Sequence, residues 1–169
     1  MFTRPPLLLT VAILGSIGVA SFIAITPIGE DFWWSRLDPV GYGVHLLRTT
    51  RGFARQRTDT LDCPLPFPPT DAWRSIASHP HGDSLFAQIY ARARPAGRLY
   101  ALIGLYHLRA PALEPALAGA HRDTASVMVW DWKAWRGSTV PLANLISSDS
   151  LDGWAGSFAN EGHNAKCAA

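Results

Sequence analysis

The feature that most constrains this chain is an uncharged run near its N-terminus, residues 7–28. As a helix, at about 1.5 Å per residue, the run spans about 33 Å, which is enough for the hydrocarbon core of a bilayer. A cleaved signal peptide has a shorter apolar run that ends in a small-residue cleavage site. The sequence therefore predicts an uncleaved transmembrane anchor over residues 1–29.

Small side chains recur along one side of this run. A spacing of four residues keeps positions on one face of a helix, and small residues on one face allow another membrane helix to approach closely. The alternative is that alanine and glycine are simply common in membrane helices. We predict a membrane helix-packing face made of Ala12, Gly15, Ser16, Ala20 and Ala24.

The residues that flank the run predict its orientation. Arg4 precedes the run, whereas Glu30 and Asp31 follow it. Because positive charge is enriched on cytoplasmic flanks, we predict a cytoplasmic N-terminus and a periplasmic body in a bacterial inner membrane. Trp33 and Trp34 come shortly after the run, and amphipathic rings favour the membrane interface. We therefore expect these two tryptophans at the membrane interface.

The rest of the chain has the composition of one packed domain. A length of 169 residues allows about one ordinary domain. Seven Trp, seven Phe and four Tyr indicate a packed core and exclude a disordered tail. A net charge of +2 is too small to indicate nucleic acid as a partner. The expected partners are instead other membrane-protein subunits and the lipid bilayer.

Residues 30–69 form the next predicted region, an interfacial segment followed by a linker. Its arginine-rich stretch, from Arg48 to Arg57, contains no acidic residue. These arginines can contact anionic headgroups, an acidic patch on a partner, or solvent alone. Cys63 begins a proline-rich stretch, which should run extended and end the linker near residue 69. The candidate partner surface in this region is Arg48, Arg51, Arg55 and Arg57.

Residues 70–169 are predicted to form a helical domain with a short β element. Prolines and capping residues divide the first half of this region into short helices. Residues 97–108 are apolar nearly all round, so this helix should be the buried centre. Ser126–Trp132 is β-branched and aromatic, which is typical of a strand, and the polar C-terminal tail reads as loop. The predicted fold class is a single N-terminal transmembrane helix plus a small mainly α (α+β) extracytoplasmic domain.

The two cysteines, Cys63 and Cys167, are too far apart for a Cys-x-x-Cys motif. In an exported chain such a pair suggests one disulfide, and the alternative is two unrelated buried thiols. Without a Cys-x-x-Cys-His signature the sequence gives no reason to expect covalent haem. We predict a disulfide between Cys63 and Cys167, and no cofactor.

The usual catalytic signatures are absent from the sequence, so we predict no catalytic residues. The best candidate for metal chemistry is His79, His81 and Asp83, whose side chains are of the types that bind zinc. A helix stop, a turn and a helix cap explain the same residues without a metal, and we favour that interpretation. His45 and His107 lie in apolar stretches, where a hydrogen-bonded core histidine is more common than a haem ligand.

A second candidate partner surface is the tryptophan group Trp130, Trp132 and Trp135. Trp130 and Trp132 share one face of a strand, because side chains alternate along it. If exposed, these rings would make a platform for sugar, lipid or protein. If buried, they belong to the core.

Together these features predict a non-catalytic accessory subunit of a multi-subunit membrane complex. An energy-transducing assembly, such as a photosynthetic reaction centre or a respiratory complex, is the specific expectation. One alternative is a membrane-anchored metal-dependent hydrolase that uses His79 and His81. The other is an envelope module that binds glycan or lipid through its tryptophans.

Overall fold

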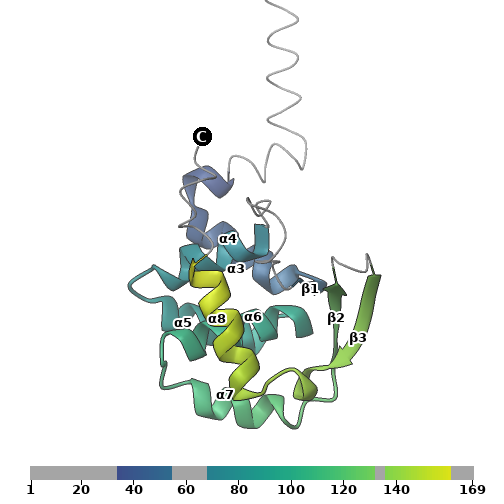
Figure 1. Cartoon of the computed structure of the whole chain (residues 1–169). Helices are drawn as coiled ribbons and strands as arrows, with labels where there is room; N and C mark the ends of the chain where they lie inside the picture. The colour runs from purple at the N-terminus through teal and green to yellow at the C-terminus, as the bar shows by residue number, and fades with distance from the viewer. Residues whose placement is uncertain (1–33, 55–67, 132–135, 161–169) are drawn as a thin grey trace, which may run out of the picture. The chain divides into compact units, whose positions relative to one another are not determined.

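A computed structural model describes residues 34–54, 68–131 and 136–160 (Figure 1). The chain divides into two compact units, residues 1–42 and 43–169. The boundary predicted near residue 69 stays a prediction.

The described elements alternate between one large helical group and a small sheet. They are, in chain order, α3 (Pro39–Thr49), β1 (Gly52–Ala54), α4 (Pro68–Ala77), α5 (Gly82–Arg92), α6 (Pro95–His107), α7 (Leu113–Ala120), β2 (Ser126–Asp131), β3 (Arg136–Pro141), the 3-10 helix η1 (Leu142–Asn144) and α8 (Ser148–Asn160) (Figure 1). This arrangement is an α+β fold.

The fold class predicted from the sequence, a transmembrane helix followed by a helical domain, is therefore corrected. Within the described residues no helix is long and apolar enough to cross a membrane. The longest described helices, α6 and α8, have 13 residues each, or about 20 Å of length, against about 30 Å of bilayer core. The run 7–28, with its predicted packing residues, lies outside the described residues, as does Trp33.

Helix α6 is the centre of the second unit, as the sequence predicts. Its residues from Ala96 to Leu105 are buried except Arg98, because the helix packs against α5, α8 and β1 on different sides. Gly104 allows α5 to come close, since a Cβ there would overlap the ring of Phe86. The apolar side chains on every side of α6 therefore pack against a neighbouring helix or strand.

The sheet has the strand order β1-β2-β3. β1 pairs parallel to β2, with Gly52 opposite Met128, and β2 pairs antiparallel to β3, with Met128 opposite Thr139. A parallel pair needs a long crossover, and the chain supplies it as α4 to α7. The inner face of the sheet meets α6 through Phe53, whose ring centroid lies 4.9 Å from that of Tyr100. The predicted strand is confirmed over Ser126–Asp131.

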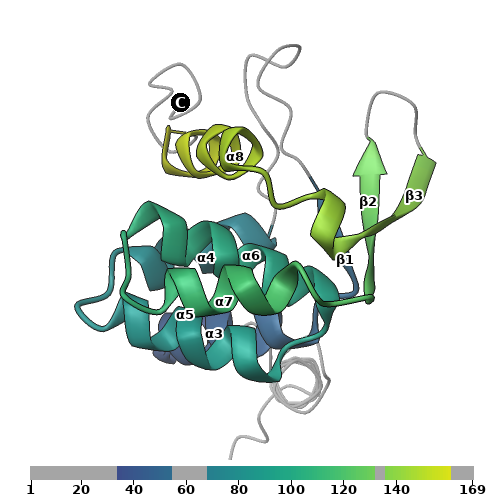
Figure 2. The ribbon, with the colours of Figure 1, turned by 90° about the horizontal axis from the view of Figure 1, so that it is seen from below.

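Residues 148–160 form helix α8, where the sequence predicts loop. Ser147 caps this helix, because its Oγ accepts a hydrogen bond from the Ser150 N–H at 3.2 Å. Leu151, Ala155 and Phe158 share one face and are buried. In Figure 2, α8 lies across one side of the group that contains α4, α6 and α7. The glycines and serines of α8 do not favour a helix by themselves, so the helix is stabilised by burial of this face.

Candidate functional site

The outward face of the sheet carries large apolar side chains at the surface. Met128 and Trp130 alternate with inward Val127 on β2 and are 44% and 41% exposed. The strand register places Gly52, Gly137 and Thr139 on the same side. We call this surface the Trp130 face, defined by Gly52, Met128, Trp130, Gly137 and Thr139.

The glycines of this face make room for the indole of Trp130. A Cβ on Gly52 would lie 3.1 Å from Cδ1 and Nε1 of Trp130. A Cβ on Gly137 would lie 3.7 Å from Cδ2 and Cε2 of the same ring. The indole therefore lies close to both Gly52 and Gly137, on the two strands that flank β2.

Strand β3 forms one edge of the sheet and borders the Trp130 face. Arg136, Gly137, Ser138 and Thr139 are all exposed. Sheet edges are usually protected by charged residues, prolines or bulges. Here Arg136 and Pro141 stand at the two ends, and no charged residue lies between them. Among the described residues no strand pairs with the outer edge of β3, so that edge can pair with another extended segment.

A group of exposed arginines lies at the junction of α3, α5 and α6. The backbone N–H of Arg94 donates a hydrogen bond to the carbonyl oxygen of Arg48 at 3.2 Å, so two distant stretches of chain meet there. We call the exposed arginines around this contact the Arg cluster: Arg48, Arg51, Arg92 and Arg94.

The structure brings together only part of the partner surface predicted from sequence. Arg48, Arg51 and Trp130 are described and exposed. Arg55, Arg57, Trp132 and Trp135 lie outside the described residues, as do Cys63 and Cys167, so the disulfide stays a prediction. Sequence reasoning missed Arg92 and Arg94. The available signal was that no acidic residue lies in residues 84–113.

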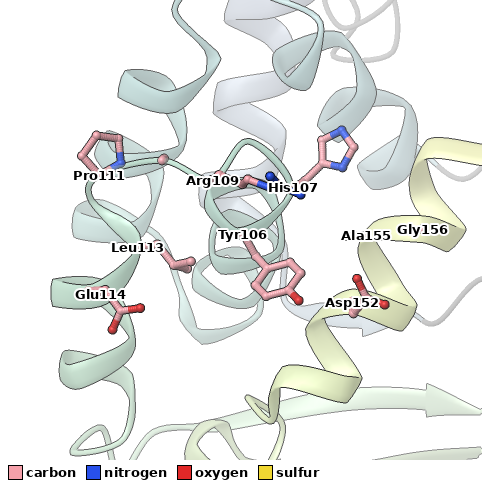
Figure 3. A pocket seen from close by; sticks show the side chains of 10 residues that line it. Tyr106, His107, Arg109, Pro111, Leu113, Glu114, Asp152, Ala155 and Gly156 are labelled. Carbon is pink, nitrogen blue, oxygen red and sulfur yellow. The ribbon is translucent and has the colours of Figure 1, made fainter.

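The described part of the chain also holds a pocket of about 570 Å³ with a mixed polar and apolar lining. Tyr106 stands in its middle, with Glu114 of α7 on one side and Asp152 of α8 on the other (Figure 3). His107 and Arg109 line the same pocket. None of these five polar side chains hydrogen bonds to another, so the pocket contains no assembled nucleophile and base.

Arg109 has an unusual backbone conformation, with φ of 49°. The N–H of Ala110 donates to the carbonyl oxygen of Leu105 at 2.9 Å, and the N–H of Arg109 donates to that of Tyr106 at 3.1 Å. This is the Schellman pattern that ends a helix, and glycine usually occupies the position of Arg109. The strained arginine thus belongs to the end of α6.

The residues His79, His81 and Asp83 form a turn and a helix start. The Nδ1 of His79 accepts a hydrogen bond from the His81 N–H at 3.1 Å, and the two rings lie 5.7 Å apart. Asp83 accepts one from the Ser84 N–H at 2.7 Å. Across the described ranges no group of three or more His, Cys, Asp or Glu residues is placed to hold a metal ion. Local backbone contacts account for these side chains.

The remaining sequence candidates lie at the surface. Trp34 is 39% exposed, and its ring makes an edge contact with Tyr42 at a centroid distance of 5.9 Å. His45 and His107, expected among core residues, are both exposed. The reason is that each lies on the solvent side of its helix, although the neighbouring residues in sequence are apolar.

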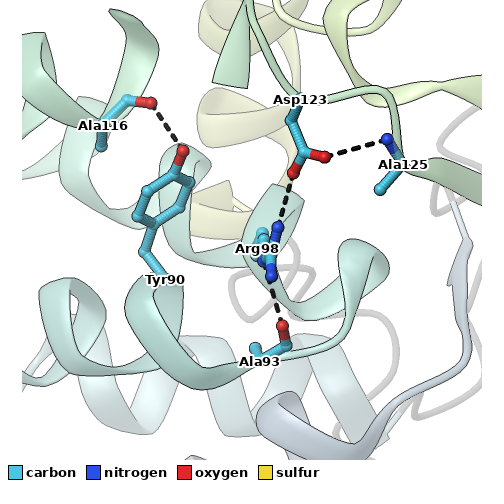
Figure 4. A network of polar contacts seen from close by, with 6 residues as sticks. All are labelled: Tyr90, Ala93, Arg98, Ala116, Asp123 and Ala125. Atoms are coloured by element: carbon cyan, nitrogen blue, oxygen red, sulfur yellow. Dashed lines mark hydrogen bonds and ion pairs between the residues drawn. The ribbon is translucent and has the colours of Figure 1, made fainter. Parts of the chain in front are cut away.

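A network of polar contacts joins α5, α6 and α7 (Figure 4). Arg98 and Asp123 form an ion pair at 2.6 Å, and Asp123 also accepts a hydrogen bond from the Ala125 N–H at 2.9 Å. The Nε of Arg98 donates to the Ala93 carbonyl oxygen at 3.1 Å. Each charge is satisfied inside the protein, so the network holds the start of β2 against α6 and is not a binding site.

Tyr90 gives this network a measurable pH dependence. Its hydroxyl donates to the Ala116 carbonyl oxygen at 2.8 Å. Burial raises the pKa of Tyr90 above its ordinary value of 10.0; Arg98 lowers the pKa and Asp123 raises it. The folded protein holds the phenol proton more tightly than the unfolded chain, so this stabilisation is complete below pH 10.0 and is lost as the pH rises through the raised pKa.

We expect Tyr90→Phe to lower the free energy of unfolding by about 1 kcal/mol at neutral pH, because one partly buried hydrogen bond is lost. Above about pH 10 the difference from the wild type should shrink, since only the wild type has a phenol to ionise. Urea denaturation across that pH range measures both effects, with Tyr106→Phe as the control. Curves that stay parallel at all pH values would contradict the raised pKa.

No known protein family, curated protein or solved structure matches this chain.

Proposed function

We propose that this chain is a non-catalytic accessory subunit that docks another protein through its Trp130 face. The observation that carries the proposal is the exposure of Met128 and Trp130 side by side on one strand of an open-edged sheet. Exposed large apolar side chains that lie together are typical of interaction surfaces.

The form of the Trp130 face supports a protein as the occupant. Tryptophan is among the residues that contribute most to binding energy at protein interfaces. The indole lies close to Gly52 and Gly137, because a Cβ on either glycine would lie within 3.7 Å of the ring. The neighbouring edge of β3 offers backbone hydrogen bonds to an extended segment of the partner.

The described pocket gives no observation that favours an enzyme. Its polar side chains come from three helices but do not hydrogen bond to one another. The hydrolase alternative stays a prediction, as does the assignment to a membrane or energy-transducing complex, which rests on residues outside the described ranges.

The proposal is tested by removing the apolar groups of the Trp130 face. The wild type and the double variant Met128→Ser/Trp130→Ser are produced at equal levels in the cells of origin. They are extracted with mild detergent and compared on native gels. We expect the wild type to migrate in an assembly much larger than the 18.4 kDa chain. The double variant should migrate as the free chain, because it loses the docking surface but keeps the inner face of the sheet.

The matched control is Leu37→Ser, which also removes an exposed apolar side chain, 81% exposed, but one that is not among the residues that define the Trp130 face. It should stay in the assembly. A wild type that migrates as an 18.4 kDa monomer contradicts the proposal. So does a purified chain that forms a dimer by itself through Trp130, because the face would then belong to a second copy.

A further inference from the structure

We propose that the segment docked on the Trp130 face is an acidic polypeptide, whose carboxylates are bound by the Arg cluster. This inference rests on the proposed function and names the chemistry of its partner.

The Arg cluster is built by a tertiary contact between stretches that lie far apart in the sequence. Arg48 ends α3 and Arg51 follows it, whereas Arg92 ends α5 and Arg94 caps α6. The hydrogen bond from Arg94 to the Arg48 carbonyl oxygen joins the two stretches. Gly97 permits this approach, because a Cβ there would overlap the Leu47 carbonyl oxygen.

The positive charge of the cluster is not neutralised within the described part of the chain. The ion pairs found there are Arg74 with Asp71 and Arg98 with Asp123, and neither uses an arginine of the cluster. The sequence has no acidic residue in 39–58 or in 84–113, the two stretches that meet at the junction. Like charges held together repel one another, so a bound anionic group is favoured there.

The Arg cluster is continuous with the Trp130 face. Arg51 directly precedes Gly52, and a Cβ on Gly52 would lie 3.1 Å from Cδ1 and Nε1 of the Trp130 indole. A single extended segment can therefore cover the indole with an apolar side chain while neighbouring side chains reach the arginines. The face selects for an apolar residue, and the cluster selects for acidic residues beside it.

The surroundings favour a polypeptide over a lipid surface. A side chain that inserts into a bilayer projects from the protein, whereas the Trp130 indole lies along the sheet between two glycines. The planar fork of arginine matches a carboxylate or a phosphate with two parallel hydrogen bonds, so the apolar Trp130 face beside the cluster, and not the arginines alone, favours a polypeptide.

The test uses the full chain and a labelled peptide of roughly ten residues that carries glutamates around a central leucine. A second peptide has glutamine in place of every glutamate. Fluorescence anisotropy measures both affinities at low and at physiological salt. We expect the wild type to bind the acidic peptide about tenfold more tightly than the glutamine peptide, with affinity that falls as salt rises.

Two charge-reversed variants locate the binding. Arg48→Glu/Arg94→Glu should weaken binding of the acidic peptide by about tenfold or more. Arg109→Glu/Arg122→Glu makes the same change in net charge at exposed positions outside the cluster and should bind like the wild type. Circular dichroism spectra of both variants establish that they fold.

Several results would overturn the inference. One is an equal loss in both variants, which would assign the effect to net charge alone. Another is binding to vesicles that contain phosphatidylserine without binding to the acidic peptide, which would assign the cluster to a lipid surface. A third result separates the two proposals. If the Met128→Ser/Trp130→Ser variant migrates as the free chain on native gels, but charge reversal of the Arg cluster and added salt do not change peptide binding, the proposed function stands and the acidic partner does not.

Discussion

Phe158→Ala is expected to lower the free energy of unfolding by about 3 to 5 kcal/mol, the usual cost of truncating a fully buried phenylalanine. The Phe158 ring is buried and lies 5.7 Å from the ring of Tyr100 and 5.4 Å from that of Trp73. It therefore joins α8 to both α6 and α4. Urea denaturation followed by tryptophan fluorescence measures the loss.

The control for this prediction lies on the same helix. A Cβ on Gly153 would have no atom within 4 Å, so Gly153→Ala adds only helix propensity and should raise the free energy of unfolding by about 0.5 to 1 kcal/mol. If Phe158→Ala were as stable as the wild type, α8 would not be docked through this ring.

Helix α8 shows why the sequence pattern misled at the C-terminus. Residues 148–160 contain Gly153, Gly156 and several serines, which lower helix propensity and resemble a loop. The apolar positions Leu151, Ala155 and Phe158 have helical spacing, but they are few. Their effect depends on a buried surface supplied by α4 and α6, which no local pattern reveals.

Helix α6 and strand β2 could be predicted because their signals are local. The run from Leu99 to Leu105 is apolar on all sides and is bounded by Pro95, so a buried helix was the natural interpretation. In β2 the β-branched and aromatic residues stand together. Strand β1 has three residues beside an arginine-rich stretch, and its partner lies far along the chain, so its pairing left no local signal.

Some residues of the candidate site could likewise be identified from the sequence, and others only from the structure. The sequence pointed to Trp130 and to Arg48 and Arg51, because their residue types are informative on their own. Arg92 and Arg94 became part of the same surface only through a contact between α3 and α6. The residue that permits this contact, Gly97, looked like any other glycine in an apolar helix.

Gly97→Ala should therefore affect both stability and binding. An added Cβ would overlap the Leu47 carbonyl oxygen and lie 2.8 Å from the Ala93 Cβ. The blocking atom belongs to the backbone, so relief requires that α3 move away from α6. Overpacking of this kind lowers the free energy of unfolding by about 3 kcal/mol, and the higher helix propensity of alanine raises it by about 1 kcal/mol. We expect a net loss of about 2 kcal/mol in urea denaturation.

The same displacement should separate Arg48 from Arg94 and weaken binding of the acidic peptide, although no charge is changed. Gly153→Ala is the matched control: it makes the same substitution in a helix with open space and should leave peptide affinity unchanged. If Gly97→Ala loses stability but binds the peptide like the wild type, the arginines act as independent charges. If affinity falls together with stability, the α3–α6 contact positions them as one site.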